Sequence, residues 1–457
     1  MRSFKLALAA VLSLSVCLFL LLIVMDAIWA YVFIGSEISS LQDEIRRNGH
    51  PVTMSEVNAY YPAVPEEQNA ALVYLRATDE LDYTTDLEKQ NHGAIWDKVS
   101  SVSGSAPYDE ILRGEVEAYL NQHSALLVKL GDAQQLPHSR YPLDLTQGAM
   151  VKLPHLAALR CLTRAVSIRA FHQVRTGDLT EIANAHRTMR HLAWSLEDEP
   201  LLISQLVRVV LISIAVESLE RDLNYTTITQ QMLVELQEIY RKTESPNWVV
   251  RAMAVERATA FEGIKQMFDG RMRTWKNEST EDTSFVDNFW WLPGMRVYEK
   301  KTQAYLLKKM GPLASSDPKS WLDRLAAAKG IEFEDNAFAA LANIYVQPFS
   351  KAPGAFARLT AKLELARAAV AVERHVADYQ EYPMTLQELV PRYLDSVPID
   401  PFDNNFMRYR RLGDTGYLLY SVSHNGDDDG GEPHGKDEHG NYLGDWCFRV
   451  ERPALTH

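Results

Sequence analysis

The sequence LTAKLELARAAVAVERHVADYQEYP occupies residues Leu359–Pro383 and decides the fold of the C-terminal part of the chain. Its apolar residues recur at the spacing of one face of an α-helix as far as Tyr379. Tyr382-Pro383 then ends the pattern, because the residue before a proline is biased away from helical backbone angles. The spacing therefore predicts one long helix over residues 359–379.

Three runs that follow this helix predict β-strands, at Met407–Arg411, Tyr417–Ser423 and Trp446–Val450. The turn-forming residues Gly413-Asp414-Thr415-Gly416 join the first two runs, so these are expected to pair as a hairpin. A short helix is expected earlier, at Thr385–Tyr393. This end of the chain is therefore predicted to be a small α+β domain, in which a long helix packs on a three-stranded antiparallel sheet.

A series of short motifs runs in order from the helix to the last strand: Tyr382-Pro383, Leu386, Leu389, Tyr393-Leu394, Pro398, Asp400-Pro401-Phe402, Tyr409, Tyr417–Ser421, Asn425-Gly426, Gly430–Glu432 and Asp445-Trp446. This order resembles the C-terminal domain of the major pseudopilin of type II secretion systems, over about a fifth of the chain. The resemblance implies a pseudopilin-like module with a calcium site on the loop between the last strands. Carried over by position, Asn425 stands where the family has its first Asp, and Asp445 where it has the last.

The composition of this loop independently favours a hard cation. Calcium takes six to eight oxygen ligands from flexible acidic loops, and one lysine stands here against seven acids, Asp427, Asp428, Asp429, Glu432, Asp437, Glu438 and Asp445. The expected ligands are Asn425, Asp427, Asp429 and Asp445. Two alternatives stay open: a solvated acidic loop without metal, and a transition-metal site built from His424, His434, His439 and Cys447.

The N-terminal segment predicts a membrane anchor. Leu6–Met25 is an apolar run without a charge, long enough to cross a bilayer as a helix. Arg2 and Lys5 precede the run and acidic residues follow it, so the positive-inside rule places the N-terminus in the cytoplasm. We therefore expect a single-pass protein of the bacterial inner membrane, with the bulk of the chain extracytoplasmic.

Other interpretations of the same segment are weaker. A cleaved signal peptide has a shorter apolar core and a small-x-small cleavage site, for which Ile28-Trp29-Ala30 is a poor candidate. A lipoprotein would be processed before Cys17, where Val16 is too large. Pseudopilins carry a basic leader, a Gly-Phe cleavage site and a nearby Glu, and this N-terminus shows none of them. We therefore expect a pseudopilin-like fold module reused in a different anchored protein.

The chain is expected to divide into a membrane anchor at 1–35, an all-α extracytoplasmic body at 36–350 and the pseudopilin-like domain at 351–457, with the boundary near Lys351–Gly354. Within the body, helical spacing over Leu153–Leu223 breaks at Thr176-Gly177-Asp178 and again at Glu197–Pro200. These breaks predict an antiparallel helical hairpin followed by a long, buried third helix.

The net charge of -13 argues against a nucleic-acid partner, which would require a basic face. The motifs of hydrolases, zinc proteases and nucleotide-binding proteins are absent from the sequence. His172, His186 and His191 lie near Glu181 and Cys161, but the spacing of these residues is that of packed helices. We therefore expect no enzyme and no small-molecule substrate, but a structural or interaction protein with an unidentified envelope partner. The alternative is an extracytoplasmic hydrolase with its site in the helical body.

Overall fold

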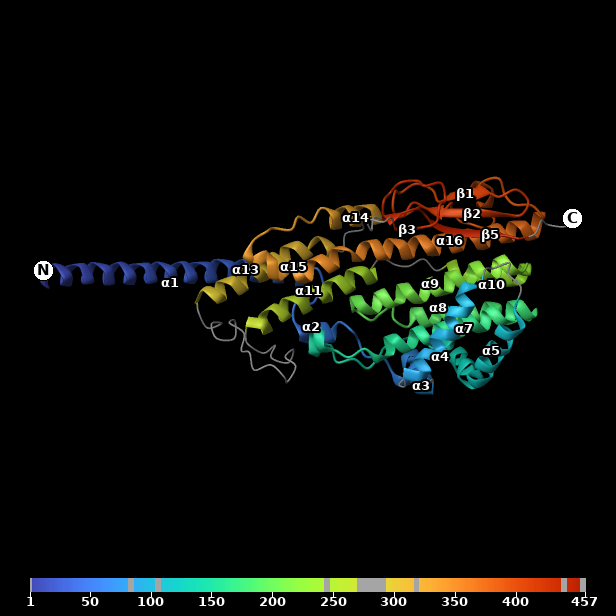
Figure 1. Cartoon of the computed structure of the whole chain (residues 1–457), viewed down its shortest axis with the longest axis horizontal. Helices are drawn as coiled ribbons and strands as arrows, with labels where there is room; N and C mark the ends of the chain where they lie inside the picture. The colour runs from blue at the N-terminus through green and yellow to red at the C-terminus, as the bar shows by residue number, and fades with distance from the viewer. Residues whose placement is uncertain are drawn as a thin grey trace.

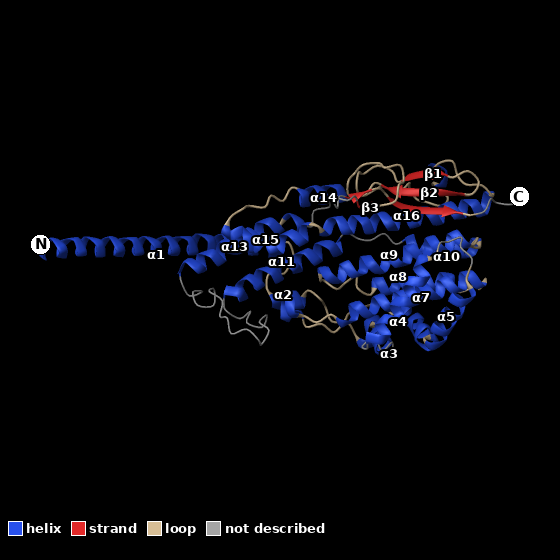
Figure 2. Cartoon of the chain, viewed as in Figure 1, coloured by secondary structure: helices blue, strands red, loops and turns tan. Residues whose placement is uncertain are grey.

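The computed structural model describes residues 2–80, 86–102, 108–241, 247–268, 293–315, 320–436 and 442–452. Its helices are α1 (Arg2–Arg47), α2 (Met54–Ala59), α3 (Ala70–Glu80), α4 (Asp86–Ser101), α5 (Glu110–Gln122), α6 (Ser124–Asp132), α7 (Pro154–Thr176), α8 (Ile182–Trp194), α9 (Leu202–Tyr225), α10 (Gln230–Arg241), α11 (Asn247–Phe268), α13 (Pro293–Met310), α14 (Trp321–Lys329), α15 (Ala337–Ser350) and α16 (Ala352–Tyr379). The strands are β1 (Arg408–Arg411), β2 (Gly416–Ser421), β3 (Gly435–Lys436), β4 (Tyr442–Leu443) and β5 (Trp446–Glu451). The fold is thus mostly helical, and its sheet residues gather near the C-terminus (Figure 2).

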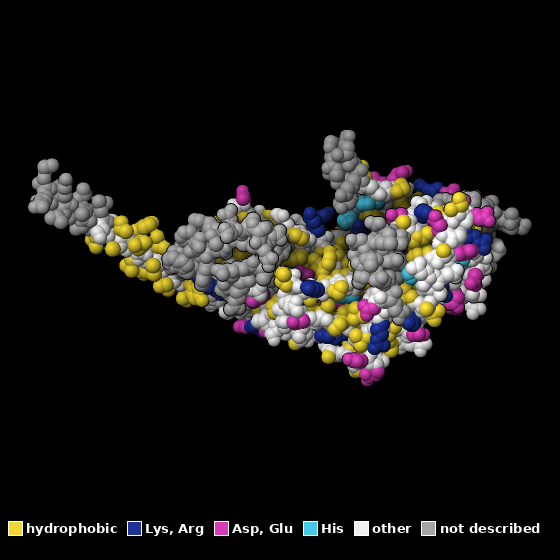
Figure 3. All heavy atoms as spheres, turned by 60° about the horizontal axis from the view of Figure 1, so that its bottom comes forward, with side chains coloured by type: hydrophobic (Ala, Val, Ile, Leu, Met, Phe, Trp, Pro, Cys, Tyr) yellow, Lys and Arg dark blue, Asp and Glu magenta, His cyan; other side chains and the backbone are white. Residues whose placement is uncertain are grey.

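Helix α1 projects from the rest of the molecule as a rod (Figure 1). Its 46 residues rise by roughly 69 Å at 1.5 Å per residue. Near its C-terminal end, Ile38 and Ile45 are buried, and this part of α1 lies against α13. Further out, the side chains from Leu14 to Met25 are exposed and mostly apolar, as Figure 3 shows along the rod.

The predicted helical hairpin and the buried third helix are confirmed as α7, α8 and α9. Helix α7 ends at Gly177, which takes the left-handed conformation that commonly closes a helix. Among the described residues, α9 is the one helix long and apolar enough to cross a membrane, but 72% of its apolar window is buried in the body. Helix α9 is therefore a core helix of the body. A shorter apolar segment, Ser13–Met25, lies in α1.

The three predicted strands and the hairpin turn are confirmed. The sheet has the order β1-β2-β5 and is antiparallel, with Tyr409 opposite Leu419 and Tyr417 opposite Val450. The long helix differs from the prediction at its start, because α16 begins at Ala352 rather than Leu359. Pro353 lies in its first turn, where a proline is tolerated because its missing N–H has no partner in a helix.

One further expectation is corrected by the backbone that follows α16. The short helix expected at Thr385–Tyr393 is a single 3-10 turn at Leu386–Leu389, since Pro391 cannot continue a helix. Residues 352–354, which belong to the expected domain boundary, form the first turn of α16, and Ala352 is buried. At Gly354 an added Cβ would lie 3.1 Å from the ring of His424, so the helix start is packed closely on the loop that follows β2.

The sheet and the helical body are joined through α9. Strand β5 is an edge strand, and edge strands leave backbone groups unpaired. Glu220 of α9 accepts a hydrogen bond from the backbone N–H of Arg449 at 2.9 Å. Asn224 donates to the carbonyl of Arg449 at 2.7 Å and accepts from the N–H of Glu451 at 2.8 Å. The side chains of Glu220 and Asn224 thus pair with backbone groups along the edge of β5. One buried apolar cluster extends through the sheet and the helical body. The expected domain division at residue 351 stays a prediction.

Glu220 is expected to make stability depend on pH. Burial raises the pKa of its carboxyl from 4.5 to about 7, although the Arg449 N–H acts against this. The folded chain therefore binds this proton more tightly than the unfolded chain, so the contribution to stability is full below pH 4.5 and is lost as the pH rises through about 7. Glu220→Gln should reduce the fall in unfolding free energy between about pH 5 and pH 8 by roughly 1–3 kcal/mol, measured by urea unfolding.

The matched control is Glu235→Gln on α10, because the Glu235 side chain is 43% exposed and pairs with Arg187 at the surface. This variant should keep the pH profile of the unaltered chain. Glu256, whose pKa burial also raises to about 7, retains part of the slope in both variants. Superimposable profiles for Glu220→Gln and Glu235→Gln would contradict the role given to Glu220.

Candidate metal site in the C-terminal loop

The candidate site lies on the loop from Ser421 at the end of β2 to Trp446 at the start of β5. Three of the four expected ligands lie close together there. The Asp429 carboxylate accepts hydrogen bonds from the Asn425 amide at 3.1 Å and from the Gly444 N–H at 2.9 Å, directly beside Asp445. The fourth, Asp427, is exposed, and among the described residues no hydrogen bond joins it to the other three.

Asp445 is the buried centre of this group. Its side chain has an exposed fraction of 0%, and its Oδ2 accepts from the Gly431 N–H at 2.8 Å. Its Oδ1 is buried and has no hydrogen-bond partner in the described part of the chain. Burial raises the pKa of Asp445; the backbone N–H groups of Gly431 and Asp429 oppose this shift, while the charges of Asp428 and Asp429 add to it. A buried carboxylate oxygen without a donor beside two further carboxylates fits a cation better than it fits a dry interior.

The remainder of a calcium shell would have to come from neutral oxygens. Within the described residues, no group of three or more His, Cys, Asp or Glu side chains is arranged to hold a metal. Calcium accepts amide and backbone carbonyl oxygens as readily as carboxylates, and Asn425 and the carbonyls of the loop are such groups. The fit is therefore partial: Asp445, Asp429 and Asn425 suit the ion, while Asp437 and Glu438 lie outside the described residues.

The residues proposed for a transition metal form a packed cluster instead. The His434 ring stacks on Trp446 with centroids 3.7 Å apart, and the His424 ring lies 6.2 Å from that of His434. Burial raises the pKa of the Cys447 thiol to about 12, so it stays protonated, and it donates to the Gly431 carbonyl at 3.3 Å. A protonated thiol is a poor metal ligand. His439 lies outside the described residues.

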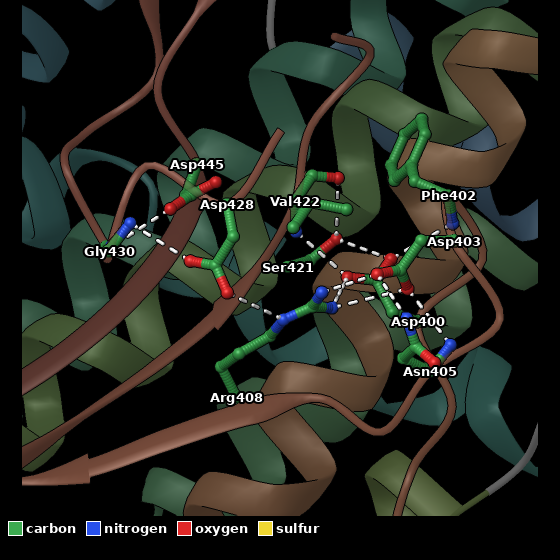
Figure 4. A network of polar contacts seen from close by, with 11 residues as sticks. Asp400, Phe402, Asp403, Asn405, Arg408, Ser421, Val422, Asp428, Gly430 and Asp445 are labelled. Atoms are coloured by element: carbon green, nitrogen blue, oxygen red, sulfur yellow. Dashed lines mark hydrogen bonds and ion pairs between the residues drawn. The ribbon is translucent and has the colours of Figure 1, made fainter. Parts of the chain in front are cut away.

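A cluster of three carboxylates around Arg408 lies beside the loop (Figure 4). Arg408 Nη1 donates to Asp400 at 2.9 Å, Nη2 donates to Asp403, and Nε donates to Asp428 at 3.4 Å. Asp428 belongs to the acidic loop, so a cation of the protein itself neutralises part of that loop. Sequence reasoning missed the cluster, because the sequence shows Asp400 only as part of a motif and Arg408 only as a strand residue.

Asp400 ties the cluster to the sheet. It is fully buried and accepts hydrogen bonds from the N–H groups of Phe402 and Val422 and from the hydroxyl of Ser421, at 3.0, 2.9 and 2.9 Å. Burial raises the pKa of its carboxyl, and these donors oppose the shift. A carboxylate with this many partners holds the end of β2, where the loop begins, in a fixed position relative to β1.

The histidines that sequence reasoning singled out do not form one site. Nδ1 of each ring pairs with a tyrosine hydroxyl from a different segment of the chain: His172 with Tyr108 at 3.0 Å, His186 with Tyr240 at 3.0 Å and His191 with Tyr74 at 2.6 Å. His186 is also 3.0 Å from Asp222, and both are fully buried. Cys161 is buried elsewhere in the core. His186 is therefore a core histidine with partners on both ring nitrogens, while His172 and His191 are half-buried and packed against tyrosines.

A second buried network escaped the sequence analysis because its members are far apart in the chain. His155 Nε2 lies 3.1 Å from Glu199 Oε2, and the Ser204 hydroxyl donates to the same carboxylate. Serine, histidine and a carboxylate also occur together in hydrolases, but here the carboxylate is central. All three side chains are at most 3% exposed, so no substrate reaches them.

Comparisons with known proteins add no family to this description. No family model matches the chain, and neither the curated proteins nor the solved structures contain a significant match. The resemblance to pseudopilins therefore stays a prediction, and a function has to be inferred from the geometry and chemistry of the chain's own residues.

Replacing Asp400 should destabilise the C-terminal module. Asp400→Ala removes one of the three carboxylates around Arg408 and leaves three hydrogen-bond donors, the N–H groups of Phe402 and Val422 and the Ser421 hydroxyl, without their acceptor. We therefore expect a loss of about 3 kcal/mol in unfolding free energy, measured by urea denaturation. Asp414→Ala is the control, because Asp414 pairs with Arg411 while its side chain is 72% exposed. Its effect should stay below about 1 kcal/mol. Equal effects of the two variants would show that the Arg408 cluster is not a stabilising contact.

Proposed function

We propose that this chain is a membrane-anchored bacterial envelope protein, with α1 crossing the inner membrane once. The observation that carries the proposal is the exposed apolar surface of α1. Exposed fractions between Leu14 and Met25 reach 73% at Leu14 and 63% at Phe19, and Phe33 is 57% exposed. Such a surface is unfavourable in water and is buried in a bilayer. The run from Leu6 to Met25 rises by about 30 Å as a helix, which matches the hydrocarbon core.

The orientation is proposed from the flanking charges. Arg2 and Lys5 precede the apolar run, and Glu37, Asp43 and Glu44 follow it. Positive residues favour the cytoplasmic side. The helical body and the C-terminal module would then both lie on the extracytoplasmic side.

A structural or interaction role is favoured over catalysis. The candidate catalytic histidines pair separately with tyrosines, and the His155 network is sealed from solvent. The acidic net charge disfavours nucleic acid as a partner. The proposed role is the presentation of the pseudopilin-like module to another envelope protein.

Calcium is proposed to steady the loop of this module. Asp445, Asp429 and Asn425 would hold the ion, and backbone carbonyls of the loop would complete its shell. The bound ion supplies the positive charge that Asp445 Oδ1 lacks. The chain's own part is to bring these oxygens together by closing the loop on Gly431 and Gly444. At Gly444 an added Cβ would lie 2.4 Å from the Pro433 carbonyl, so this close approach requires glycine.

One observation supports the alternative of a hydrolase in the helical body. A pocket of about 320 Å³ is lined by His191, Glu197 and three arginines, Arg187, Arg190 and Arg208. These side chains come from α8, the turn after it and α9, so a histidine and a carboxylate from separate segments share one cavity. Loss of a hydrolytic activity in His191→Ala, with membrane association unchanged, would favour this alternative.

The anchor can be tested by substitutions inside the apolar run. Leu18→Arg with Leu21→Arg places two charges at bilayer depth, each unfavourable by about 2.5–3.5 kcal/mol for insertion. We expect the unaltered chain to remain with membranes after carbonate washing and to be released by detergent, whereas the double-arginine variant should be lost from the membrane fraction. The measurement is immunoblotting of the fractions.

The control is Leu18→Ala with Leu21→Ala, which removes bulk without adding charge and should stay in the membrane. Release of the unaltered chain by carbonate would overturn the anchor. Recovery of a soluble product that begins near Tyr31 would instead identify a cleaved signal peptide.

The calcium site can be tested by melting the full-length chain in detergent. A ligand that binds only the folded state stabilises it by about 2.7 kcal/mol at a hundredfold excess over its dissociation constant. The chain should therefore melt higher in calcium than in chelator, and Asp445→Asn should remove the difference. Asp427→Asn is the matched control and should keep it, because Asp427 stands apart from the group. Equal melting of the unaltered chain in calcium and in chelator would mean a solvated acidic loop.

A further inference from the structure

A second cavity lies at the base of α1, where this helix meets the body. Its volume is about 470 Å³. The end of α1 contributes Leu41 and Ile45, α13 contributes Leu307, and Asn48, His50 and Arg257 are among its polar residues. The cavity therefore combines an apolar wall with a few polar groups, as ligand pockets commonly do.

Arg257 of α11 is the unusual group in this cavity. Its side chain is only 4% exposed, and its Nη2 is buried without a hydrogen-bond partner among the described residues. No ion pair joins it to a carboxylate in that part of the chain. Burial lowers the pKa of Arg257 to about 10, so the guanidinium remains charged at neutral pH. A buried cation without a counter-charge is strongly unfavourable.

Other arginines of the chain show what is missing at Arg257. Arg452, 8% exposed, pairs with Glu373 at 2.8 Å. Arg251, on the same helix as Arg257, pairs with Asp198 at 3.0 Å and donates to the Tyr60 carbonyl at 3.2 Å. Arg452 and Arg251 each contact an acidic side chain, whereas Arg257 lines the cavity and has no such ion pair among the described residues.

The described residues around Arg257 in the cavity offer hydrogen-bond donors but no buried negative charge. His50 Nδ1 lies 3.3 Å from the Tyr60 hydroxyl, and its Nε2 is buried without a partner among the described residues. Burial and the nearby Arg257 lower the pKa of His50, so the ring is neutral and can donate from Nε2 when Tyr60 donates to Nδ1. Glu44 also lines the cavity, but it is exposed to solvent, and Lys308 is already paired with Glu37 at 2.6 Å.

We propose that this cavity binds a small oxyanion, a phosphate or carboxylate group, through the guanidinium of Arg257, with His50 and Asn48 as further donors. Arginine suits this ligand because its fork of N–H groups matches two oxygens at once. The apolar wall of Leu41, Ile45 and Leu307 accommodates a carbon skeleton attached to the anion. The site is separate from the acidic loop and does not depend on calcium there.

The oxyanion can come from solution or from a lipid headgroup, and the position of the cavity favours solution. The exposed apolar surface of α1 ends at Phe33, and Leu41 lies eight residues further on. Eight residues rise by about 12 Å, whereas the headgroup layer on one side of a bilayer is roughly 5–8 Å thick. With α1 as an anchor, the cavity would lie beyond the headgroups.

The test uses the full-length chain in neutral detergent, melted in inorganic phosphate or in chloride at equal ionic strength. Phosphate should raise the melting temperature in a saturable manner in the unaltered chain. Arg257→Gln should melt higher than the unaltered chain in chloride, because the unpaired charge is gone, and should not respond to phosphate. Arg251→Gln is the matched control and should respond as the unaltered chain does.

A second variant keeps the test decisive if Arg257→Gln does not fold. Asn48→Asp places a carboxylate in the lining of the same cavity, where it should compete with phosphate, so phosphate should bind to this variant more weakly in equilibrium dialysis. A phosphate effect of equal size in Arg257→Gln, or no effect on the unaltered chain, overturns the proposal. In nanodiscs without phosphate, stabilisation by phosphatidylglycerol over phosphatidylcholine would identify the anion as a lipid headgroup; stabilisation by dissolved phosphate alone would identify a soluble ligand.

Discussion

Helix α16 is buried from two opposite sides, by the sheet of β1, β2 and β5 and by helices α9 and α10. Leu365, Val370 and Val372 on this helix are at most 1% exposed. A sheet of three short strands buries too little apolar area to be stable alone, so it depends on α16 for a core. The body depends on the same helix, since α9 and α10 would otherwise expose apolar side chains to water.

The second contact between sheet and body follows from this arrangement. Once α16 holds the sheet against α9, the outer edge of β5 comes within reach of Glu220 and Asn224. The edge is covered by side chains rather than by another strand, which prevents edge-to-edge association without extending the sheet. The low polarity of that junction is also what raises the pKa of Glu220.

Charged groups in the structural parts of the molecule are paired with opposite charges, whereas the two candidate binding sites each contain a buried charged group with an atom that is unpaired within the described part of the chain. Glu373 and Arg452 neutralise each other at 2.8 Å beside α16, and Arg408 neutralises its three carboxylates. Asp445 and Arg257 differ from these pairs, with opposite signs: among the described residues, Oδ1 of Asp445 has no hydrogen-bond donor and Nη2 of Arg257 has no acceptor. Buried polar groups usually have partners, and the cation proposed at Asp445 and the anion proposed at Arg257 would supply them.

The sequence predicted the elements better than the sites, for physical reasons. The strands and α16 could be predicted because hydrophobic period and turn chemistry are local properties of the sequence, although the predicted start of the helix, Leu359, lies seven residues after the observed start at Ala352. Three of the four metal candidates come together, while Asp427, one residue from Asp428, turns to solvent. The sequence could not predict the ion pairs of Arg408 or the lack of an acceptor at Nη2 of Arg257 among the described residues. Such contacts form, or fail to form, only when segments distant in the sequence pack together in the fold.

Helix α1 joins the proposed membrane anchor directly to the helical body. The helix runs without a break from its exposed apolar length into the part packed on α13, where Glu37 pairs with Lys308 and Ile38 is buried. An unbroken helix transmits orientation, whereas a loop would let the body turn freely. If α1 crosses the membrane, the body is therefore held at a fixed height, with the C-terminal module at the far end (Figure 1). The Arg257 cavity lies at the joint itself, so an anion bound there would stiffen the connection between anchor and body by linking α11 to the end of α1.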